Sequence, residues 1–331
     1  MSRPLSVVLV GCGHQGRFHL RHLRASPDVE LVAVIDPDPG ARASAGAGAP
    51  TYADLATFVR DGTGASAVEA AVVAVPTPAH TEVGCACLDA GWAVLLEKPL
   101  AGTPRDARRL VEAAGGRLLR VGHIERFNPA VRAAEPALGV PLFVEGHRLG
   151  PFRERMDLVD VVLDLMIHDL DLLLRWTGGR VAEVRAAGAR VLTGEVDIAN
   201  VRLQFDTGCV ANLTASRASL EQMRKLRVFA DDRYVSVDMA QHRVQLLRRE
   251  EGADCAVPRI ADESPEVDGD ADALAAQQAA FAAEVRADRG GAPIAESRLA
   301  TPEQAAAALD LAHEIREAVE AHARRVGVPR A

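Results

Sequence analysis

Short apolar runs alternate with amphipathic stretches through the first third of this 331-residue chain. The apolar runs are continuous, which is typical of parallel strands buried on both faces, and they occupy residues 7–10, 31–35, 70–75, 92–96 and 118–121. Helical patterns lie between them, at residues 17–23, 54–60, 81–90 and 103–114. This alternation predicts an α/β protein with an N-terminal Rossmann domain, a doubly wound parallel sheet that spans residues 1–122.

The pattern changes after residue 122. Shorter runs, several of them alternating apolar and polar residues, occupy residues 142–149, 181–190, 198–205, 209–216, 226–230, 234–239 and 243–247. They predict an open, mostly antiparallel sheet with one packed face and one available face. Residues 252–270 are acidic and contain proline, which predicts an exposed loop, and helices are expected at 271–288 and 302–325. Residues 123–331 are therefore expected to form an α+β domain for substrate binding and oligomerisation.

A Gly-x-Gly-x-x-Gly motif follows the first apolar run. Gly11 allows a tight turn, Gly13 lets the backbone approach a pyrophosphate, and Gly16 lets the next helix pack closely on the strand. Asp36 ends the second apolar run about 20 residues after Gly16, where a carboxylate that binds a ribose is expected. Because the motif follows a strand and opens a helix, it predicts a dinucleotide site.

The composition narrows the class of protein. Hydrophobic residues make up 48% of the chain and the net charge is −8, so two domains can each bury a core and no basic surface for nucleic acid is expected. No apolar run approaches the roughly 20 residues that a membrane helix needs. Five cysteines, an odd number, argue for a reducing compartment and against a disulfide framework. We therefore expect a cytoplasmic protein whose substrate is a small molecule.

Lysine is rare in this chain. Only Lys98 and Lys225 are lysines among 38 basic side chains, so arginine serves almost wherever a plain positive charge is needed. A lysine can give up its proton near neutral pH when its pKa is lowered, whereas an arginine cannot. Both lysines are therefore candidates for a chemical role.

A long helical pattern runs from Met156 to Trp176 in the second half. Its polar residues recur at spacings of three and four, which places them on one stripe of a helix; they are Asp157, Asp160, Asp164, His168, Asp171 and Arg175. Apolar residues flank the stripe, and an unpaired buried carboxylate or imidazole costs several kcal/mol. We expect a site centred on Asp164 and His168. The alternative is an acidic helix face exposed to solvent.

Ligands of doubly wound sheets bind at the carboxyl ends of the strands. Besides the glycines and Asp36, the residues expected to contact a dinucleotide there are His14, Gln15, Pro76, Thr77, His80, Glu97, Lys98 and His123. An alcohol loses hydride only as its O–H proton departs, so a base is needed near neutral pH, and a lysine or a histidine can supply it. The expected catalytic residues are Lys98, His168 and Asp164. The sequence leaves open whether Lys98 or His168 is the formal base.

Together these motifs resemble the Gfo/Idh/MocA oxidoreductase family. The resemblance rests on the glycine motif, Asp36, the turn at 76–80, the triplet at 97–99 and the Asp164-x-x-x-His168 pattern, and it covers essentially the whole chain. It implies that Lys98 and the Asp164/His168 pair form the catalytic centre. It also implies a substrate among the sugars, nucleotide sugars and cyclitols.

Residues 121–129 and 164–171 resemble the branch of this family that oxidises the 3-hydroxyl of UDP-N-acetylglucosamine. That resemblance implies a 3-keto product that is transaminated to an amino sugar for lipid A of lipopolysaccharide or for surface glycans. Two substrate phosphates would need cations. The residues expected to bind the substrate are Arg126, Asn128, Arg153, Asp164, His168 and Lys225, and further candidate cations are Arg148, Arg155, Arg217, Arg224 and Arg227.

NAD is the expected cofactor, because Asp36 would repel the 2′-phosphate of NADP and Arg42 lies too far along the chain to offset it. Whether NAD is released or recycled in place stays open. No metal centre is expected, because no further His or Cys with ligand spacing lies near His168 and Asp169. The free face of the second sheet, as is usual in the family, predicts a homo-oligomer, either a dimer or a tetramer.

Three other functions stay open. The chain is also compatible with a dehydrogenase of a free sugar or inositol, or of a uronic acid of UDP-N-acetylglucosamine. A non-catalytic NAD-binding regulator of the same fold is a third possibility. That role predicts a missing lysine or histidine at the site, and neither residue is missing.

Overall fold

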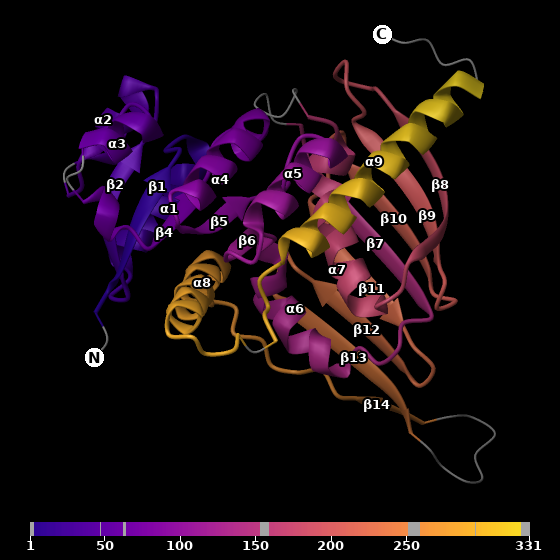
Figure 1. Ribbon diagram of the computed structural model, residues 1–331. Coiled ribbons are helices and arrows are strands. Elements are labelled where there is room, and N and C mark those ends of the chain that lie inside the picture. The colour runs from indigo at the N-terminus through magenta and orange to yellow at the C-terminus, as the bar shows by residue number, and fades with distance from the viewer. Residues whose placement is uncertain are drawn as a thin grey trace. The chain divides into compact units, whose positions relative to one another are not determined.

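The computed structural model describes residues 3–46, 48–61, 64–152, 159–250, 259–294 and 296–325 (Figure 1). The chain divides into two compact units. The first contains residues 1–124 and 272–307, and the second contains residues 125–271 and 308–331. The expected boundary at residue 122 lies close to the first break. The segment 272–307 returns to the first unit, which a single boundary at residue 122 does not describe.

The first unit contains a six-stranded parallel sheet with strand order β3-β2-β1-β4-β5-β6. Its strands are β1 (Leu5–Val10), β2 (Val29–Ile35), β3 (Thr51–Tyr52), β4 (Ala70–Val73), β5 (Ala93–Glu97) and β6 (Leu119–Gly122). Its helices are α1 (His14–Ala25), α2 (Pro39–Ala45), α3 (Leu55–Asp61), α4 (His80–Asp89), α5 (Pro104–Ala114) and α8 (Ala273–Arg289). The predicted doubly wound parallel sheet is confirmed.

The sequence explains where these elements begin and end. β1 and β4 are buried at every position, as their continuous apolar runs predicted. The helix α5 begins at Thr103, whose hydroxyl accepts a hydrogen bond from the Asp106 N–H, and Pro104 occupies its first turn. It ends before Gly115, which has a positive φ of 51°.

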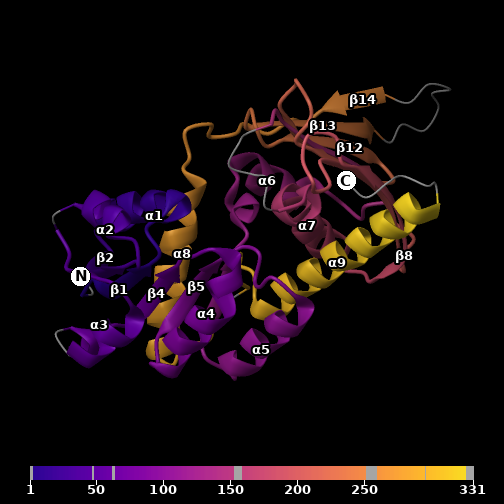
Figure 2. The same ribbon diagram turned by 90° about the horizontal axis from the view of Figure 1, so that it is seen from above.

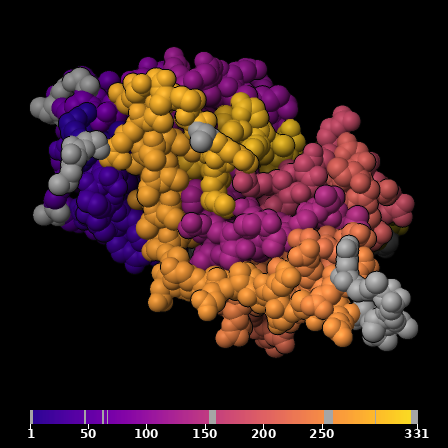
Figure 3. All heavy atoms as spheres, turned by 90° about the horizontal axis from the view of Figure 1, so that it is seen from below, coloured from indigo at the N-terminus to yellow at the C-terminus, as the bar shows by residue number. Residues whose placement is uncertain are grey.

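Helix α8 packs in the first unit although it follows the second sheet in sequence. Figure 3 shows its orange spheres against the indigo spheres of the N-terminal elements, and helix α1 contacts it. Arg120 of β6 donates a hydrogen bond of 2.6 Å to Glu284 of α8. These contacts explain why residues after 271 belong to the first unit.

The second unit contains an eight-stranded sheet with order β14-β13-β12-β11-β7-β10-β9-β8. Neighbouring strands are antiparallel except for the parallel pair β7 and β10. The strands are β7 (Phe143–Leu149), β8 (Val181–Ala189), β9 (Ile198–Phe205), β10 (Val210–Ser216), β11 (Met223–Phe229), β12 (Arg233–Asp238), β13 (Arg243–Glu250) and β14 (Arg259–Asp262). The predicted mostly antiparallel sheet is confirmed, and β14 is a strand where a loop was expected.

Helices cover one face of this second sheet. They are α6 (Pro129–Ala134), α7 (Ile167–Thr177) and most of α9 (Pro302–Arg325), and Figure 2 shows them on the same side of the strands. Val144, Gly146 and Arg148 of β7 are buried toward these helices, whereas the alternate residues of β7 are half-buried on the opposite face. Short 3₁₀ turns occur at Ala65–Ala67, Thr77–Ala79, Ile124–Phe127 and Glu135–Ala137.

The helix expected from Met156 to Trp176 differs from the prediction. Residues 153–158, which include Asp157, lie outside the described residues. Helical structure begins at Val161, because the Asp160 carboxylate accepts hydrogen bonds from the N–H groups of Val162 and Leu163. A π-helical turn, Val162–Met166, then precedes α7. This wide turn changes the helical phase, so the five described polar residues, from Asp160 to Arg175, do not share one stripe.

Candidate active site

The glycine motif has the geometry that close contact with a phosphate requires. Gly11 has a φ of 90°, and a Cβ there would lie 2.5 Å from the carbonyl oxygen of Ala74. A Cβ on Gly16 would lie 2.1 Å from the Gly11 carbonyl oxygen. By contrast, a Cβ on Gly13 would meet no atom within 4 Å. The turn is therefore packed tightly from behind and open at Gly13, at the N-terminus of α1.

The open end of α1 has the electrostatics of an anion site. Its first turn contains no acidic residue, and Gly13, His14 and Gln15 are exposed. The His14 ring packs edge-on against Phe18, with 5.3 Å between the ring centroids. The unpaired N–H groups of the first turn and the helix dipole both favour a negative charge there. These residues fit the pyrophosphate of a dinucleotide.

Asp36 follows β2 and is held in place on both sides. Its carboxylate accepts hydrogen bonds from the N–H groups of Cys12, at 2.7 Å, and Asp38, at 2.8 Å. The expectation that Arg42 lies too far along the chain is wrong. Its Nη1 donates to the main-chain carbonyls of Asp36, at 2.6 Å, and Pro37, at 2.9 Å. Helix α2 returns Arg42 to this turn, so a cation does lie beside Asp36.

Glu97 and Lys98 follow β5 at the same edge of the sheet, and both are half-buried. Glu97 Oε1 lies 2.7 Å from Nε2 of His19, and Glu97 Oε2 accepts a hydrogen bond from the Lys98 N–H at 3.2 Å. Burial alone would raise the pKa of Glu97. The hydrogen bond from His19 and the electrostatic interactions with His19 and Lys98 outweigh burial and hold this pKa below its ordinary value. A carboxylate therefore lies beside the Lys98 backbone and ammonium group.

The turns after β4 and β6 carry the other residues expected at this edge. Pro76 is exposed and Thr77 is half-buried, so both are accessible, whereas His123 is buried. The His80 ring is buried, with Nδ1 2.7 Å from the Pro99 carbonyl oxygen and Nε2 3.0 Å from the Val75 carbonyl oxygen. Both of its ring nitrogens are therefore used to join the turn after β4 to the turn after β5. This placement differs from the expected cofactor contact.

In the second unit, Asp164 and His168 lie on adjacent turns of the segment that combines the π-helical turn with α7. Asp164 is within the π-helical turn and His168 is in the first turn of α7. Both are half-buried, as is Leu165 beside them, whereas most of the surrounding helix is buried. This accessible face on an otherwise covered helix is consistent with a substrate-binding surface.

Arg126 does not fit the expected role in phosphate binding. Its Nε and Nη2 atoms each donate a 2.7 Å hydrogen bond to the carboxylate of Asp171, and both side chains are only 2% exposed. Asn128 caps α6 by accepting from the Ala130 N–H, and its amide donates to Glu125 and the Met239 carbonyl. The structure uses both polar side chains internally.

A second buried ion pair lies nearby in the same unit. Arg148 donates to Asp169 with a shortest N–O distance of 2.6 Å and to Glu125 at 2.8 Å. Burial opposes the charge of Arg148, but the two carboxylates raise the pKa of this guanidinium above its ordinary value. Arg148 therefore joins β7 to α7, and its charge is balanced before any substrate binds.

Lys225 lies on the wrong face of the sheet for the role expected of it. Alternation along β11 places Leu226 and Val228 toward the helices and Lys225 on the opposite face, where its Nζ lies 3.8 Å from Asp238. Arg224 lies on the helix-covered side, in register with Arg148. It lines a cavity of about 90 Å³ together with Arg148, Leu165, Ser216, Arg217 and Gln222. Arg224 therefore replaces Lys225 as the candidate cation on the side of the sheet where Leu165 lies.

The remaining candidate cations are used elsewhere or lie outside the described residues. Arg227 is on the same face as Lys225 and pairs with Glu145 at 2.9 Å. Arg217 is buried and donates to the Val159 carbonyl. Arg153 and Arg155 lie outside the described residues.

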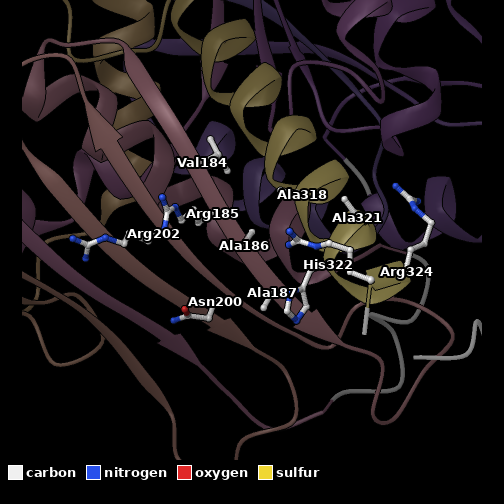
Figure 4. Close-up of a pocket in the computed structure, with 11 residues that line it drawn as sticks. Val184, Arg185, Ala186, Ala187, Asn200, Arg202, Ala318, Ala321, His322 and Arg324 are labelled. Atoms are coloured by element: carbon white, nitrogen blue, oxygen red, sulfur yellow. The ribbon is translucent and has the colours of Figure 1, made fainter. Parts of the chain in front are cut away.

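A larger groove, of about 870 Å³, lies between the strands β8 and β9 and the last turns of α9 (Figure 4). Its lining is alanine-rich and basic. Arg185 and Arg202 extend from the strands, and His322 and Arg324 come from α9. None of the residues predicted for catalysis lines this groove, so its size alone does not identify the site.

Sequence reasoning missed His19. The sequence motifs give His19 no role at the site, but it is hydrogen-bonded to Glu97 and is 1% exposed. A signal was present, because Gly16, His19, Leu20 and Leu23 follow the i, i+3, i+4, i+7 spacing of a buried helix face. A histidine on the buried face of the helix that opens at the glycine motif needs a partner.

Two further features concern only the residues that the structure describes. Within them, no helix is long and apolar enough to span a membrane. No group of three or more His, Cys, Asp or Glu side chains has the arrangement of a metal site in the same part of the chain.

The fold and this edge of the sheet are those of a nicotinamide-dependent oxidoreductase. Residues 5–123 match the Gfo/Idh/MocA oxidoreductase family with its NAD-binding Rossmann fold, and residues 133–236 match the C-terminal domain of that family. The chain belongs to the Gfo/Idh/MocA oxidoreductase family, as its motifs predicted. NAD is the cofactor that this family binds.

Individual relatives refine the comparison. The chain is 35% identical to UDP-N-acetylglucosamine 3-dehydrogenase of Acidithiobacillus ferrooxidans over 320 residues, which are 96% of this chain and 98% of that protein. A solved structure of that enzyme superposes with a TM-score of 0.84 and covers 97% of this chain and 99% of the other. Inositol 2-dehydrogenase of Rubrobacter xylanophilus is 33% identical, but over only 56% of each chain. Levoglucosan dehydrogenase in complex with NADH, at 17% identity and a TM-score of 0.78, shares the fold.

Proposed function

We propose that this protein oxidises the 3-hydroxyl of UDP-N-acetylglucosamine to a 3-keto nucleotide sugar, with NAD as the hydride acceptor. One observation carries the choice of substrate. Similarity to UDP-N-acetylglucosamine 3-dehydrogenase extends over 96% of this chain, whereas the match to inositol 2-dehydrogenase extends over 56%. A match over 96% of the chain includes most of the second half, in which the substrate-binding residues are proposed to lie.

The residues at the edge of the parallel sheet supply the cofactor-binding part of the proposal. The turn of Gly11, Gly13 and Gly16 fits a pyrophosphate, and Asp36 offers a carboxylate to the adenosine ribose. Pro76, Thr77, His123 and Glu97 are proposed to line the nicotinamide half. NAD, when bound, takes up the hydride that leaves the sugar carbon.

Lys98 and His168 are proposed to handle the proton of the reacting hydroxyl. As the C3–H bond breaks, the O–H proton must pass to a base, and the oxygen then forms the ketone. Lys98 is the proposed base, while His168, oriented by Asp164, binds the hydroxyl or passes the proton onward. Asp164 also has acceptor oxygens for a neighbouring sugar hydroxyl. Arg224 is the proposed contact for a substrate phosphate.

We also infer the setting in which the enzyme works. The described cysteines Cys12, Cys85, Cys87 and Cys209 are free thiols, which supports a reducing compartment such as the cytoplasm. The face of the second sheet that carries Lys225 and Arg227 is the proposed surface for a homodimer or homotetramer. The keto product would supply an aminotransferase in the synthesis of an amino sugar for lipid A or surface glycans.

The test is a substrate panel with product analysis. Purified protein is incubated with NAD and, separately, UDP-N-acetylglucosamine, its uronic acid derivative, UDP-glucose, N-acetylglucosamine and myo-inositol. The proposal expects NADH to form with UDP-N-acetylglucosamine, and deuterium at C3 to slow the reaction. Turnover of inositol in preference to UDP-sugars would contradict it.

A further inference from the structure

A buried chain of hydrogen bonds links helix α8 to the Glu97–Lys98 pair. Nε2 of Gln278 lies 3.0 Å from Nδ1 of His19. Nε2 of His19 lies 2.7 Å from Oε1 of Glu97, and Oε2 of Glu97 accepts from the Lys98 N–H at 3.2 Å. The three elements involved, α1, β5 and α8, all belong to the first unit.

These hydrogen bonds define the orientation of each side chain that takes part in them. Nε2 of Gln278 also lies 3.3 Å from the His19 main-chain oxygen, so the amide NH₂ faces two acceptors. An amide NH₂ can only donate, which leaves Nδ1 of His19 as an acceptor and places the ring proton on Nε2. That N–H points at Glu97. Gln278 therefore selects the tautomer of His19 that donates to the carboxylate.

We propose that His19 is a positioning residue for Lys98 and acts by holding the Glu97 carboxylate. In this position one carboxylate oxygen accepts the His19 N–H and the other accepts the Lys98 N–H. The Lys98 main chain is therefore fixed at the end of β5, which positions its side chain. The proposal rests on the proposed function only in taking Lys98 as the catalytic base.

The surroundings of Glu97 support this role. Without the His19 N–H, burial would favour the neutral carboxyl, and Lys98 would lose its negative neighbour. Gly122, which pairs with Glu97 in the sheet, leaves room for the carboxylate, since a Cβ there would lie 3.3 Å from Glu97 Oε1. The room beside Gly122 and the N–H donor of His19 therefore both favour a charged Glu97 carboxylate in this position.

The contact between His19 and Glu97 also connects the helix that follows the glycine motif to the strand that precedes Lys98. His19 lies on α1, the helix whose N-terminus opens at Gly13, whereas Glu97 ends β5. One buried side chain therefore links the phosphate-facing helix to the catalytic strand. Because α8 supplies Gln278, a segment far along the sequence takes part in positioning Lys98.

The first experiment compares the kinetics of His19→Ala, His19→Gln and Gln278→Leu. His22→Ala is the matched control, because His22 lies on the same helix and pairs with Asp272 rather than Glu97. We expect His19→Ala to lower kcat by about 10- to 100-fold with the Kd for NAD unchanged, since small displacements of a catalytic group have effects of that size. His19→Gln keeps an N–H donor and should recover part of the lost kcat. Gln278→Leu should lower kcat less than His19→Ala does.

A second readout needs no substrate. Only two lysines occur in the chain, so reductive ¹³C-methylation gives two resolvable side-chain NMR signals, assigned with Lys225→Arg. In His19→Ala the chemical shift of the Lys98 signal is expected to change, because the carboxylate beside Lys98 is no longer held in place, while the Lys225 signal stays in place. If no sugar is oxidised by the wild-type protein, the proposed function fails and this spectrum still decides the role of His19.

Three results would overturn the proposal. One is a His19→Ala protein with wild-type kcat and an unmoved Lys98 signal. Another is a fall in NAD affinity and thermal stability as large as the fall in kcat, which would make His19 a packing residue. If His19→Ala does not fold, His19→Gln and Gln278→Leu are compared in its place. An unmoved Lys98 signal in both of these variants would then contradict the proposal.

Discussion

The guanidinium of Arg126 and the carboxylate of Asp171 form two parallel hydrogen bonds, each 2.7 Å long, inside the second unit. A fork-to-fork pair of this kind leaves the carboxylate well satisfied and fixes both side chains. It explains why an arginine that sequence reasoning assigned to a substrate phosphate is instead part of the protein interior. The pair joins the 3₁₀ turn Ile124–Phe127 to helix α7.

Removing one member of this pair should destabilise the second unit strongly. Arg126→Met leaves the Asp171 charge buried and uncompensated, which typically costs about 3–5 kcal/mol. We expect a lower urea midpoint for the second unit by fluorescence, with a smaller loss in Arg126→Met/Asp171→Leu. If Arg126→Met instead had wild-type stability and a higher KM for the substrate, Arg126 would be assigned to phosphate binding.

His80 should make the first unit sensitive to acid. Burial lowers the pKa of His80 below its ordinary value of 6.5, although the carbonyl groups of Pro99 and Val75 oppose that shift. As pH falls below 6.5, the unfolded chain takes up a proton at His80 that the folded chain does not, so stability falls. Thermal unfolding between pH 7.5 and 5.0 should show this loss. In His80→Asn the dependence of the unfolding temperature on pH should be weaker. An unchanged dependence would show that His80 does not cause the sensitivity to acid.

Arg224 and Lys225 are adjacent residues that should behave oppositely. Arg224 lines the cavity beside Leu165, while Lys225 lies on the other face of the sheet. Loss of a hydrogen bond to a charged group costs about 1.5–3 kcal/mol, so Arg224→Ala should raise KM for UDP-N-acetylglucosamine about 10- to 100-fold. Lys225→Ala should leave KM within about twofold. Steady-state kinetics of each variant gives the two KM values. A larger rise in KM for Lys225→Ala than for Arg224→Ala would place Lys225 at the substrate site instead.

Asp36 and Arg42 together should determine the choice of cofactor. Asp36→Ser removes the charge that repels a 2′-phosphate and leaves Arg42 on the same turn. We expect this variant to bind NAD about tenfold more weakly and to bind NADP measurably, as a contact of about 1.4 kcal/mol implies. Asp36→Ser/Arg42→Ala should lose the gain in NADP binding. Equal NADP binding by both variants would show that Arg42 has no part in it.

The fold could be predicted from the hydrophobic pattern because most elements bury at least one face. The continuous runs of β1 and β4, and the alternation in β9, correspond to the strands observed. The strand β14 has no such pattern, since its residues are mostly exposed at the edge of the sheet. The return of α8 to the first unit depends on contacts between distant segments, such as Gln278 with His19, which periodicity does not encode.

The candidate site was predicted best where a residue's role follows from its place in the chain. Gly13 and Lys98 lie at carboxyl ends of strands, as their sequence contexts indicated. The cations were harder to assign, because charge alone does not tell which partner a side chain has. Arg126 has a buried carboxylate as its partner, and the phase of β11 determines that Arg224 rather than Lys225 is on the helix side.

The most direct test measures NADH formation at 340 nm with UDP-N-acetylglucosamine, comparing the wild-type protein with Lys98→Met. We predict turnover by the wild-type protein and a rate lower by about 10²- to 10⁴-fold in the variant, the usual contribution of a general base. NAD affinity, measured by fluorescence, should be the same in both proteins. Turnover by Lys98→Met at the wild-type rate would contradict Lys98 as the base, and no turnover by the wild-type protein with bound NAD would contradict the substrate.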